Sequence, residues 1–242
     1  MSMNRKRFAP ENPQAKRLIF IPLLLLAMGC AVFGQSYVHR PDARVASHGS
    51  YGVGLHLAPG GGLLAGLSVG FFDRFQIGLS YGGGNIIGSG PIEWYPLPPG
   101  VQAKVAILDE ASFPLSLAVG FDSQDPVGSI EVNQAGFYLV AGKLIPAGWV
   151  AFDLAIGTGY DLLEEHAFHL YAVSGVVLGD VFSITPELTV YPQRQVDVLN
   201  LGLSFKWEIY EDTGVEFLLA DILTGPVEGW TRSVRFQITQ EF

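Results

Sequence analysis

The chain has 242 residues, of which 49% are hydrophobic and only 15% are charged. An average globular chain has about 25% charged residues, and the 30 glycines here lie among Leu, Val and Phe rather than in polar, low-complexity sequence. This composition excludes a disordered chain. It predicts one large or two small β domains with much apolar surface to bury or to present to lipid.

The first 34 residues differ from the rest. Five basic residues precede LIFIPLLLLAMGCAVFG, a run of 17 uncharged residues that ends in small ones. This order predicts a secretory signal peptide that is cleaved after Gly34. A permanent anchor helix is an alternative, although Pro22 and the short run argue against it. Lipidation of Cys30 is a second alternative, because AMGC loosely resembles a lipobox.

Removal of residues 1–34 would change the charge balance. The segment holds five of the 14 basic and one of the 23 acidic residues, which leaves nine basic and 22 acidic residues and a net charge of −13. Binding to nucleic acid requires a basic patch, so we expect no nucleic-acid partner. Cys30 is the only cysteine, and the remaining chain therefore has no disulfide.

From residue 49 onward, apolar residues alternate with small or polar ones, as in FQIGLSYG at 75–82. A period of two indicates β-strands. We predict 12 strands, with 10 to 14 as the range, in a closed antiparallel transmembrane up-and-down β-barrel of the all-β class. The predicted spans are 49–58, 61–71, 74–83, 99–109, 112–123, 134–145, 148–159, 166–177, 181–191, 196–209, 213–223 and 231–242.

The predicted connections alternate between tight turns and longer loops. Outer-membrane barrels have this asymmetry, with short periplasmic turns and longer external loops. An even number of strands places both termini in the periplasm. The chain is thus divided into a signal peptide (1–34), a short periplasmic segment (35–48) and an outer-membrane barrel (49–242). A soluble barrel or sandwich is the alternative, but the less apolar face is mostly Gly, Ser and Ala, which suits a narrow lumen better than a solvated exterior.

The chain ends in RSVRFQITQEF, an alternating strand that stops on an aromatic residue. We expect Arg235, Gln237 and Thr239 to face the lumen, whereas Gln240 is a polar exception on the apolar side. The signal peptide, the strands and this terminus resemble Gram-negative outer-membrane β-barrel proteins. In that class the last strand carries an assembly signal that the barrel-assembly machinery reads. The resemblance assigns this signal to Val234, Phe236, Ile238 and Phe242.

Two glycine-rich phrases carry a narrower resemblance. FFDRFQIGLSYGGGNIIGSG and LAVGFDSQ are similar to the small barrels of the YjbH group. That likeness implies a role in exopolysaccharide production or secretion, with polysaccharide as a partner.

The sequence offers little for catalysis. His166 and His169 are three residues apart, so they point to opposite faces of one strand and cannot share a metal ion. His169 is expected on the lumen side and Ser174 on the other side, so no Ser and His are spaced for nucleophilic catalysis. Glu164 and Glu165 are predicted to lie in a longer loop, where they are candidates for contact with a cation or with lipopolysaccharide-linked calcium. We predict no enzyme activity, no catalytic or metal site and no cofactor.

Polar residues that face inward are the most informative part of the chain. We expect them to pair with one another or with water, because an isolated charge in a lumen is costly. Either a plugged barrel or a narrow water-filled pore satisfies that requirement. The residues of this predicted network are Gln76, Lys104, Asp153, Glu187, Lys206 and Arg235.

The long loop at 82–98 could cap the barrel mouth, and its Trp94 and Tyr95 are candidates for contact with sugar rings. The main functional prediction is a barrel without enzyme activity that supports envelope structure or exopolysaccharide export. A small porin-like solute channel is the alternative, and an outer-membrane hydrolase is less favoured. The expected partners are outer-membrane lipid, lipopolysaccharide and the barrel-assembly machinery.

Overall fold

The computed structural model describes residues 38–94, 99–123, 136–162, 167–179, 181–193, 198–210, 213–223 and 231–241. All of them belong to one compact unit, Phe33–Phe242. The predictions for Cys30, Tyr95, Glu164, Glu165, His166 and Phe242 fall outside the described residues.

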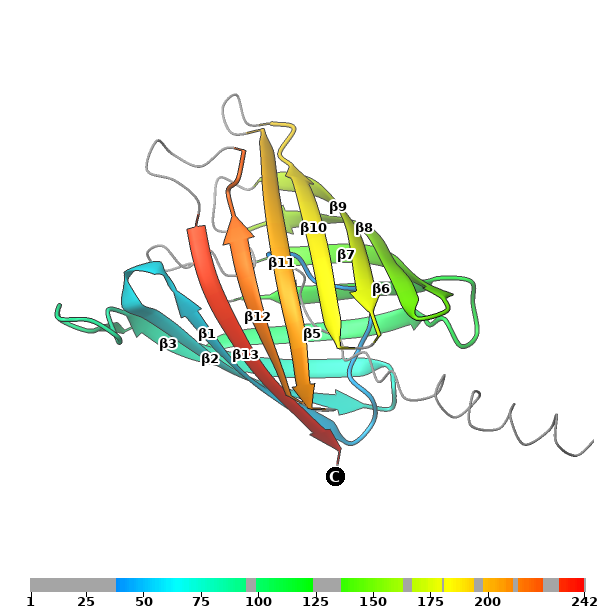
Figure 1. Cartoon of the computed structure of the whole chain (residues 1–242), viewed down its shortest axis with the longest axis horizontal. Coiled ribbons are helices and arrows are strands. Elements are labelled where there is room, and N and C mark those ends of the chain that lie inside the picture. The colour runs from blue at the N-terminus through cyan, green and yellow to red at the C-terminus, as the bar shows by residue number, and fades with distance from the viewer. Residues whose placement is uncertain are drawn as a thin grey trace, which may run out of the picture. The chain divides into compact units, whose positions relative to one another are not determined.

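Most described residues are in antiparallel strands (Figure 1). The short 3-10 helix η1 (Pro59–Gly61) joins the first two strands, and β4 (Glu93–Trp94) is a two-residue strand beside β3. No helix among the described residues is long and apolar enough to cross a membrane. The strands that form the main sheet are β1 (Ser50–Ala58), β2 (Gly62–Phe71), β3 (Phe75–Gly84), β5 (Gly100–Leu108), β6 (Ser116–Asp122), β7 (Gly136–Ala147), β8 (Val150–Asp161), β9 (Phe168–Leu178), β10 (Phe182–Val190), β11 (Leu199–Tyr210), β12 (Thr213–Ala220) and β13 (Thr231–Glu241).

The sheet closes on itself. Each of these strands pairs with its sequence neighbours, β2 pairs with β3, and β1 pairs with β13 from Ser50↔Glu241 to Leu57↔Val234. Closure leaves no unpaired sheet edge. The prediction of a closed antiparallel barrel of 12 strands is confirmed.

One strand boundary differs clearly from the prediction. The strand expected at 112–123 begins only at Ser116. Asp109 Oδ1 accepts hydrogen bonds from the backbone N–H groups of Ala111 and Ser112, which holds this stretch in a turn. Pro114 follows, and its lack of an N–H prevents normal ladder pairing. An Asp followed by a nearby Pro is a turn signal that the alternating pattern concealed.

The outer surface of the barrel is apolar. Ile156 is 67% exposed and Phe236 is 41% exposed, although both are large apolar side chains. In the last strand, Phe236 and Ile238 face outward and Thr239 is buried on the inside, as the alternation predicts. Further members of this outward apolar band are Val53, Leu55, Leu67, Ile77, Leu79, Val101, Val119, Phe137, Leu139, Phe152, Leu154, Leu170, Leu188 and Phe217.

Gln240 is the polar exception in the outward row of β13. Its Oε1 accepts a hydrogen bond of 2.6 Å from the hydroxyl of Tyr51, which faces outward on the neighbouring strand β1. The amide oxygen of Gln240 is therefore paired on the outer face with Tyr51, whose ring is an apolar body with a polar tip.

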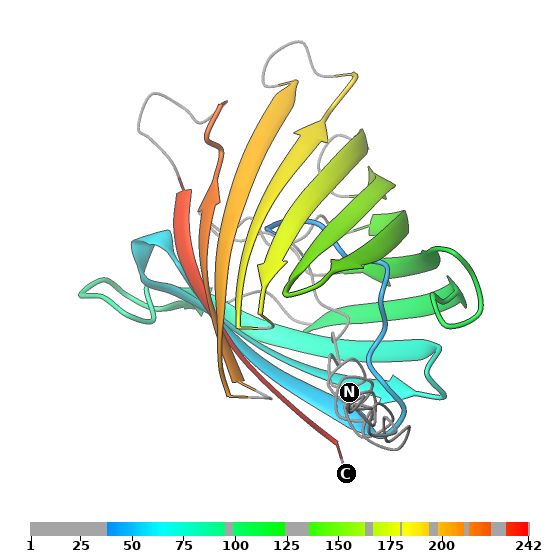
Figure 2. The ribbon, with the colours of Figure 1, turned by 45° about the vertical axis from the view of Figure 1, so that its right-hand side comes forward.

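Residues 38–47 run within the ring of strands before the chain enters β1 (Figure 2). Val38 and Ala43 are 1% and 3% exposed, although neither belongs to a strand. The barrel interior is thus partly filled by the segment of the chain that precedes it.

Candidate functional site in the barrel lumen

The lumen segment, residues 38–47, is anchored first by apolar contacts. Val38 packs with the buried side chains of Leu218 and Ala220, and it lies directly over Gly202. A Cβ at Gly202 would come within 2.8 Å of Val38 Cγ1, so glycine is needed for this approach. Ala43 joins a second apolar cluster on the wall formed by β6 to β9, whose other members are Ala118, Val140, Ala155, Tyr171 and Val173.

Arg40 of the lumen segment is buried and contacts three side chains of the barrel wall. Its Nε donates to Thr189 Oγ1 at 3.2 Å, and its Nη2 donates to the hydroxyl of Tyr191 at 2.5 Å. Its Nη1 lies 3.2 Å from His169 Nε2. These contacts fix the guanidinium against β9 and the end of β10.

Glu187 holds the backbone of the same stretch. This carboxylate is buried, and it accepts hydrogen bonds from the N–H groups of His39 at 3.1 Å and of Arg40 at 3.1 Å. Bonds from N–H groups to a charged acceptor are stronger than neutral ones. Glu187 therefore fixes where the segment turns within the lumen.

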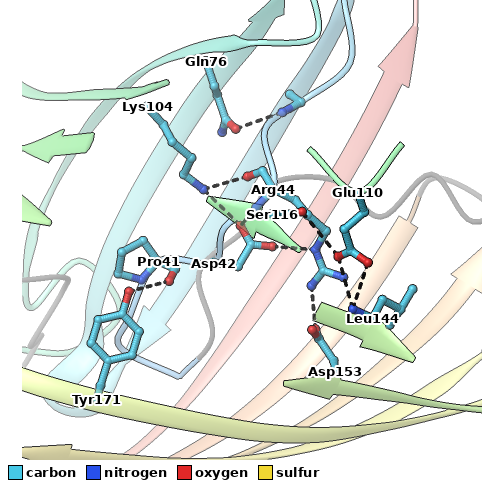
Figure 3. Close-up of polar contacts among 11 residues, drawn as sticks. Pro41, Asp42, Arg44, Gln76, Lys104, Glu110, Ser116, Leu144, Asp153 and Tyr171 are labelled. Atoms are coloured by element: carbon cyan, nitrogen blue, oxygen red, sulfur yellow. Dashed lines mark hydrogen bonds and ion pairs between the residues drawn. The ribbon is translucent and has the colours of Figure 1, made fainter. Parts of the chain in front are cut away.

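A cluster of four charges binds the middle of the segment to both sides of the barrel (Figure 3). Asp42 accepts from Lys104 Nζ on β5 at 3.1 Å and from Arg44 Nε at 3.2 Å. Arg44 Nη2 also lies 2.5 Å from Asp153 Oδ2 on β8. The charges alternate in sign, so each one is compensated by its neighbours.

The C-terminal end of the lumen segment is held beside the start of β1. Gln76 Oε1 accepts from the N–H of Ala46 at 3.1 Å. The carbonyl of Ser47 accepts from the N–H of Ser50 at 3.1 Å and from its hydroxyl at 2.7 Å. A Cβ at Gly70 would lie 2.2 Å from the Ser47 carbonyl, so a glycine is required opposite this turn.

All six residues of the predicted lumen network face the barrel interior, but they do not pair chiefly with one another. Five contact the lumen segment, namely Gln76, Lys104, Asp153, Glu187 and Arg235. Arg235 also pairs with Glu216 at 2.9 Å, while Lys206 pairs with Glu208 two residues along its own strand.

The prediction for residues 35–48 is a short periplasmic segment that takes no part in the barrel. The structure places 38–47 inside the ring, where they supply most of the partners of the inward charges. The signal was present as RPDAR at 40–44. Three charges in five residues have the composition of a surface loop, and only the acids and bases on distant strands show that they are buried.

On β6 and β8, three glycines are each covered by an aromatic ring of the neighbouring strand. A Cβ at Gly120 would lie 2.2 Å from the Tyr138 hydroxyl, and one at Gly157 would lie 2.2 Å from Tyr171 Cζ. His169 covers Gly159 in the same way. These rings thicken the wall on which the lumen segment rests, and Tyr171 donates a hydrogen bond to the carbonyl of Pro41.

An open cavity of about 190 Å³ lies beside the lumen segment. One of its walls is formed by β1, β2 and β3, where Gly52, Gly54, Gly66 and Gly78 face inward. At Gly54 and Gly66 an added Cβ would meet only ordinary contacts at 3.8 and 3.9 Å. Here, in contrast to Gly120 and its ring, the absent side chains leave free space.

The remaining predicted site residues do not form a reactive centre. His169 is held beside Arg40, while Ser174 is exposed on the outer face. Trp94 is 60% exposed and stacks on Tyr81 with ring centroids 6.2 Å apart. Among the described residues, no three His, Cys, Asp or Glu side chains come together as a metal site requires.

No protein-family model and no curated protein matches the chain. Among solved structures, the KdgM porin is 10% identical, covering 80% of this chain and 99% of its own length, with a TM-score of 0.49. The NanC porin in a rhombohedral crystal form is 10% identical over 79% and 99%, with a TM-score of 0.47. The Acinetobacter baumannii outer membrane protein Omp33 is 9% identical over 80% and 97%, with a TM-score of 0.44. Such distant likenesses carry no statement about function, which rests on the chain's own geometry.

Proposed function

We propose that the chain is an outer-membrane β-barrel that passes small solutes through a narrow lumen beside residues 38–47. Its outward band supports a location in lipid, because contiguous apolar patches of this extent are rare on soluble monomers. Closure of the barrel supports the same location, since hydrocarbon cannot satisfy the polar groups of a sheet edge.

The channel proposal is carried by the cavity. It lies beside the glycine wall, which is the part of β1, β2 and β3 that contains Gly52, Gly54, Gly66 and Gly78. A cavity needs about 10–15 Å³ to hold one water, so about 190 Å³ has room for roughly a dozen. The lumen segment packs on β6 to β10 and lines this cavity with His39, Arg40 and Pro41, but it does not fill it. A barrel whose only task was structural would gain stability from larger side chains at Gly54 and Gly66.

A structural barrel or one that supports exopolysaccharide export is the alternative, favoured by the many contacts that hold the lumen segment in place. The likeness to the YjbH group has no support among the solved structures named above. A hydrolase has less support, because the described residues show His169 engaged with Arg40 rather than placed beside a nucleophile.

The proposal includes the partners expected of such a barrel. Outer-membrane lipid and lipopolysaccharide would contact the apolar band. The barrel-assembly machinery would read the alternate residues of the last strand, of which Val234, Phe236 and Ile238 lie on the outer side.

The test begins with outer-membrane fractionation and with gel mobility before and after boiling. A folded barrel should shift its mobility on heating. The purified protein is then placed in a planar bilayer, where small, discrete conductance steps are expected. Well-folded protein that stays electrically silent at all voltages would contradict the channel and favour the structural alternative.

A further inference from the structure

We infer that the cavity beside the glycine wall is a binding site for an uncharged, hydroxyl-rich solute such as a small sugar or polyol. This inference rests on the proposed channel and adds the class of solute. Three observations carry it: the compensation of the charges around the cavity, the uncommitted polar side chains on its wall, and the free space above the glycines.

The cavity lining carries three basic side chains and one acidic one, but carboxylates behind the lining compensate two of the bases. Lys104 is paired with Asp42 at 3.1 Å, and Arg235 is paired with Glu216 at 2.9 Å. The two further charges on the lining, Arg40 and Asp122, are opposite in sign. A charged solute that entered would lose water without meeting an uncompensated partner, and this loss is costly.

Three lining side chains remain available for hydrogen bonds. They are Ser68 on β2, Gln102 on β5 and Gln237 on β13. Within the part of the chain that the structure describes, none of the three bonds to another protein group. Amides and hydroxyls both donate and accept, which matches the hydroxyl groups of a sugar or polyol.

The glycines determine how these groups are presented. Ser68 pairs across the sheet with Gly52 on one side and Gly78 on the other, and Gln237 pairs with Gly54. The Ser68 hydroxyl and the Gln102 amide lie over Gly52 and Gly78, at 3.0 and 2.9 Å from the position of an added Cβ. Gly54 and Gly66 have free space above them, so a flat solute can approach the wall closely there.

The experiment uses the full-length protein in lipid vesicles and compares the entry of glucose with that of glucuronate by vesicle swelling. The two sugars are matched in size and differ in charge. We expect glucose to enter severalfold faster. Gln102→Leu and Gln237→Leu keep approximately the side-chain volume and should each lower glucose entry severalfold.

Gln240→Leu is the matched control, because this amide lies on the outer face beside Tyr51. It should leave glucose entry unchanged. Preferred entry of glucuronate, or glucose entry that is unaffected by both lumen substitutions, would overturn the solute assignment while an ion conductance still upheld the channel. Absence of both conductance and swelling would overturn the proposed channel as well.

Discussion

The two halves of the lumen wall use glycine in opposite ways. On β6 to β9 the glycines are covered by aromatic rings, and the lumen segment packs on that thickened wall through Ala43. On β1 to β3 Gly54 and Gly66 face open space. The same residue type therefore supports close packing in one half and leaves open space in the other, and only the neighbouring strand distinguishes the two cases.

Release of the lumen segment should have the largest effect on this asymmetry. Asp42→Ala combined with Arg44→Ala removes the charges that join the segment to Lys104 and Asp153. The segment should then move within the lumen, and the single-channel conductance should rise severalfold in planar bilayers. Lys206→Met is the control, because its ion pair with Glu208 does not involve the segment. An unchanged conductance in the double variant would show that the segment does not limit the flow of ions.

Filling the cavity beside β1 to β3 should lower the conductance. Gly66→Leu points a large side chain into the cavity from a site where a Cβ has room. We expect a folded barrel whose conductance is clearly reduced. Ala65→Leu, one residue away on the outer face, should conduct like the wild type. Equal currents in the two variants would place the ion path elsewhere.

On β6 to β9, where aromatic rings cover the glycines, a substitution should change the stability of the barrel rather than its conductance. Gly157→Ala would place a Cβ 2.2 Å from Tyr171 Cζ, so the ring must move away from the wall. Overpacking of this kind costs about 1–3 kcal/mol. Urea unfolding in vesicles, followed by tryptophan fluorescence, measures the loss. Gly66→Ala should cost far less, and a cost equal to that of Gly157→Ala would remove the distinction between the two walls.

The smallest effect is expected outside the lumen. Tyr51→Phe removes the hydrogen bond to Gln240 on the outer face. A single bond of this kind contributes about 1 kcal/mol or less. Unfolding in the same vesicles should therefore shift only slightly, and the conductance should not change. A change in conductance would mean that the outer face is coupled to the lumen.

The sequence predicts the strands well because the alternation of outward apolar residues with small or polar ones repeats from residue 49 onward. It identifies the inward side of Lys104 and Glu187, since a strand of known register fixes the face of each residue. It fails for Asp42 and Arg44, because no period marks a segment without secondary structure. Nor does the sequence show that Gly157 is covered and Gly66 is open. That difference depends on the neighbouring strand, because Tyr171 covers Gly157 and no side chain covers Gly66.

We infer that the lumen segment covers the wall formed by β6 to β9 around Ala43 and leaves the wall formed by β1 to β3 open. The direct measurement is thiol modification during current recording, in a Cys30→Ser background that removes the only native cysteine. Gly54→Cys faces the open half, and Ala155→Cys lies beneath Ala43 in the covered half. We expect a charged, membrane-impermeant thiol reagent to react rapidly at Gly54→Cys and to change the current, while Ala155→Cys stays unreactive. Equal reaction at both sites, or reaction only at Ala155→Cys, would contradict it.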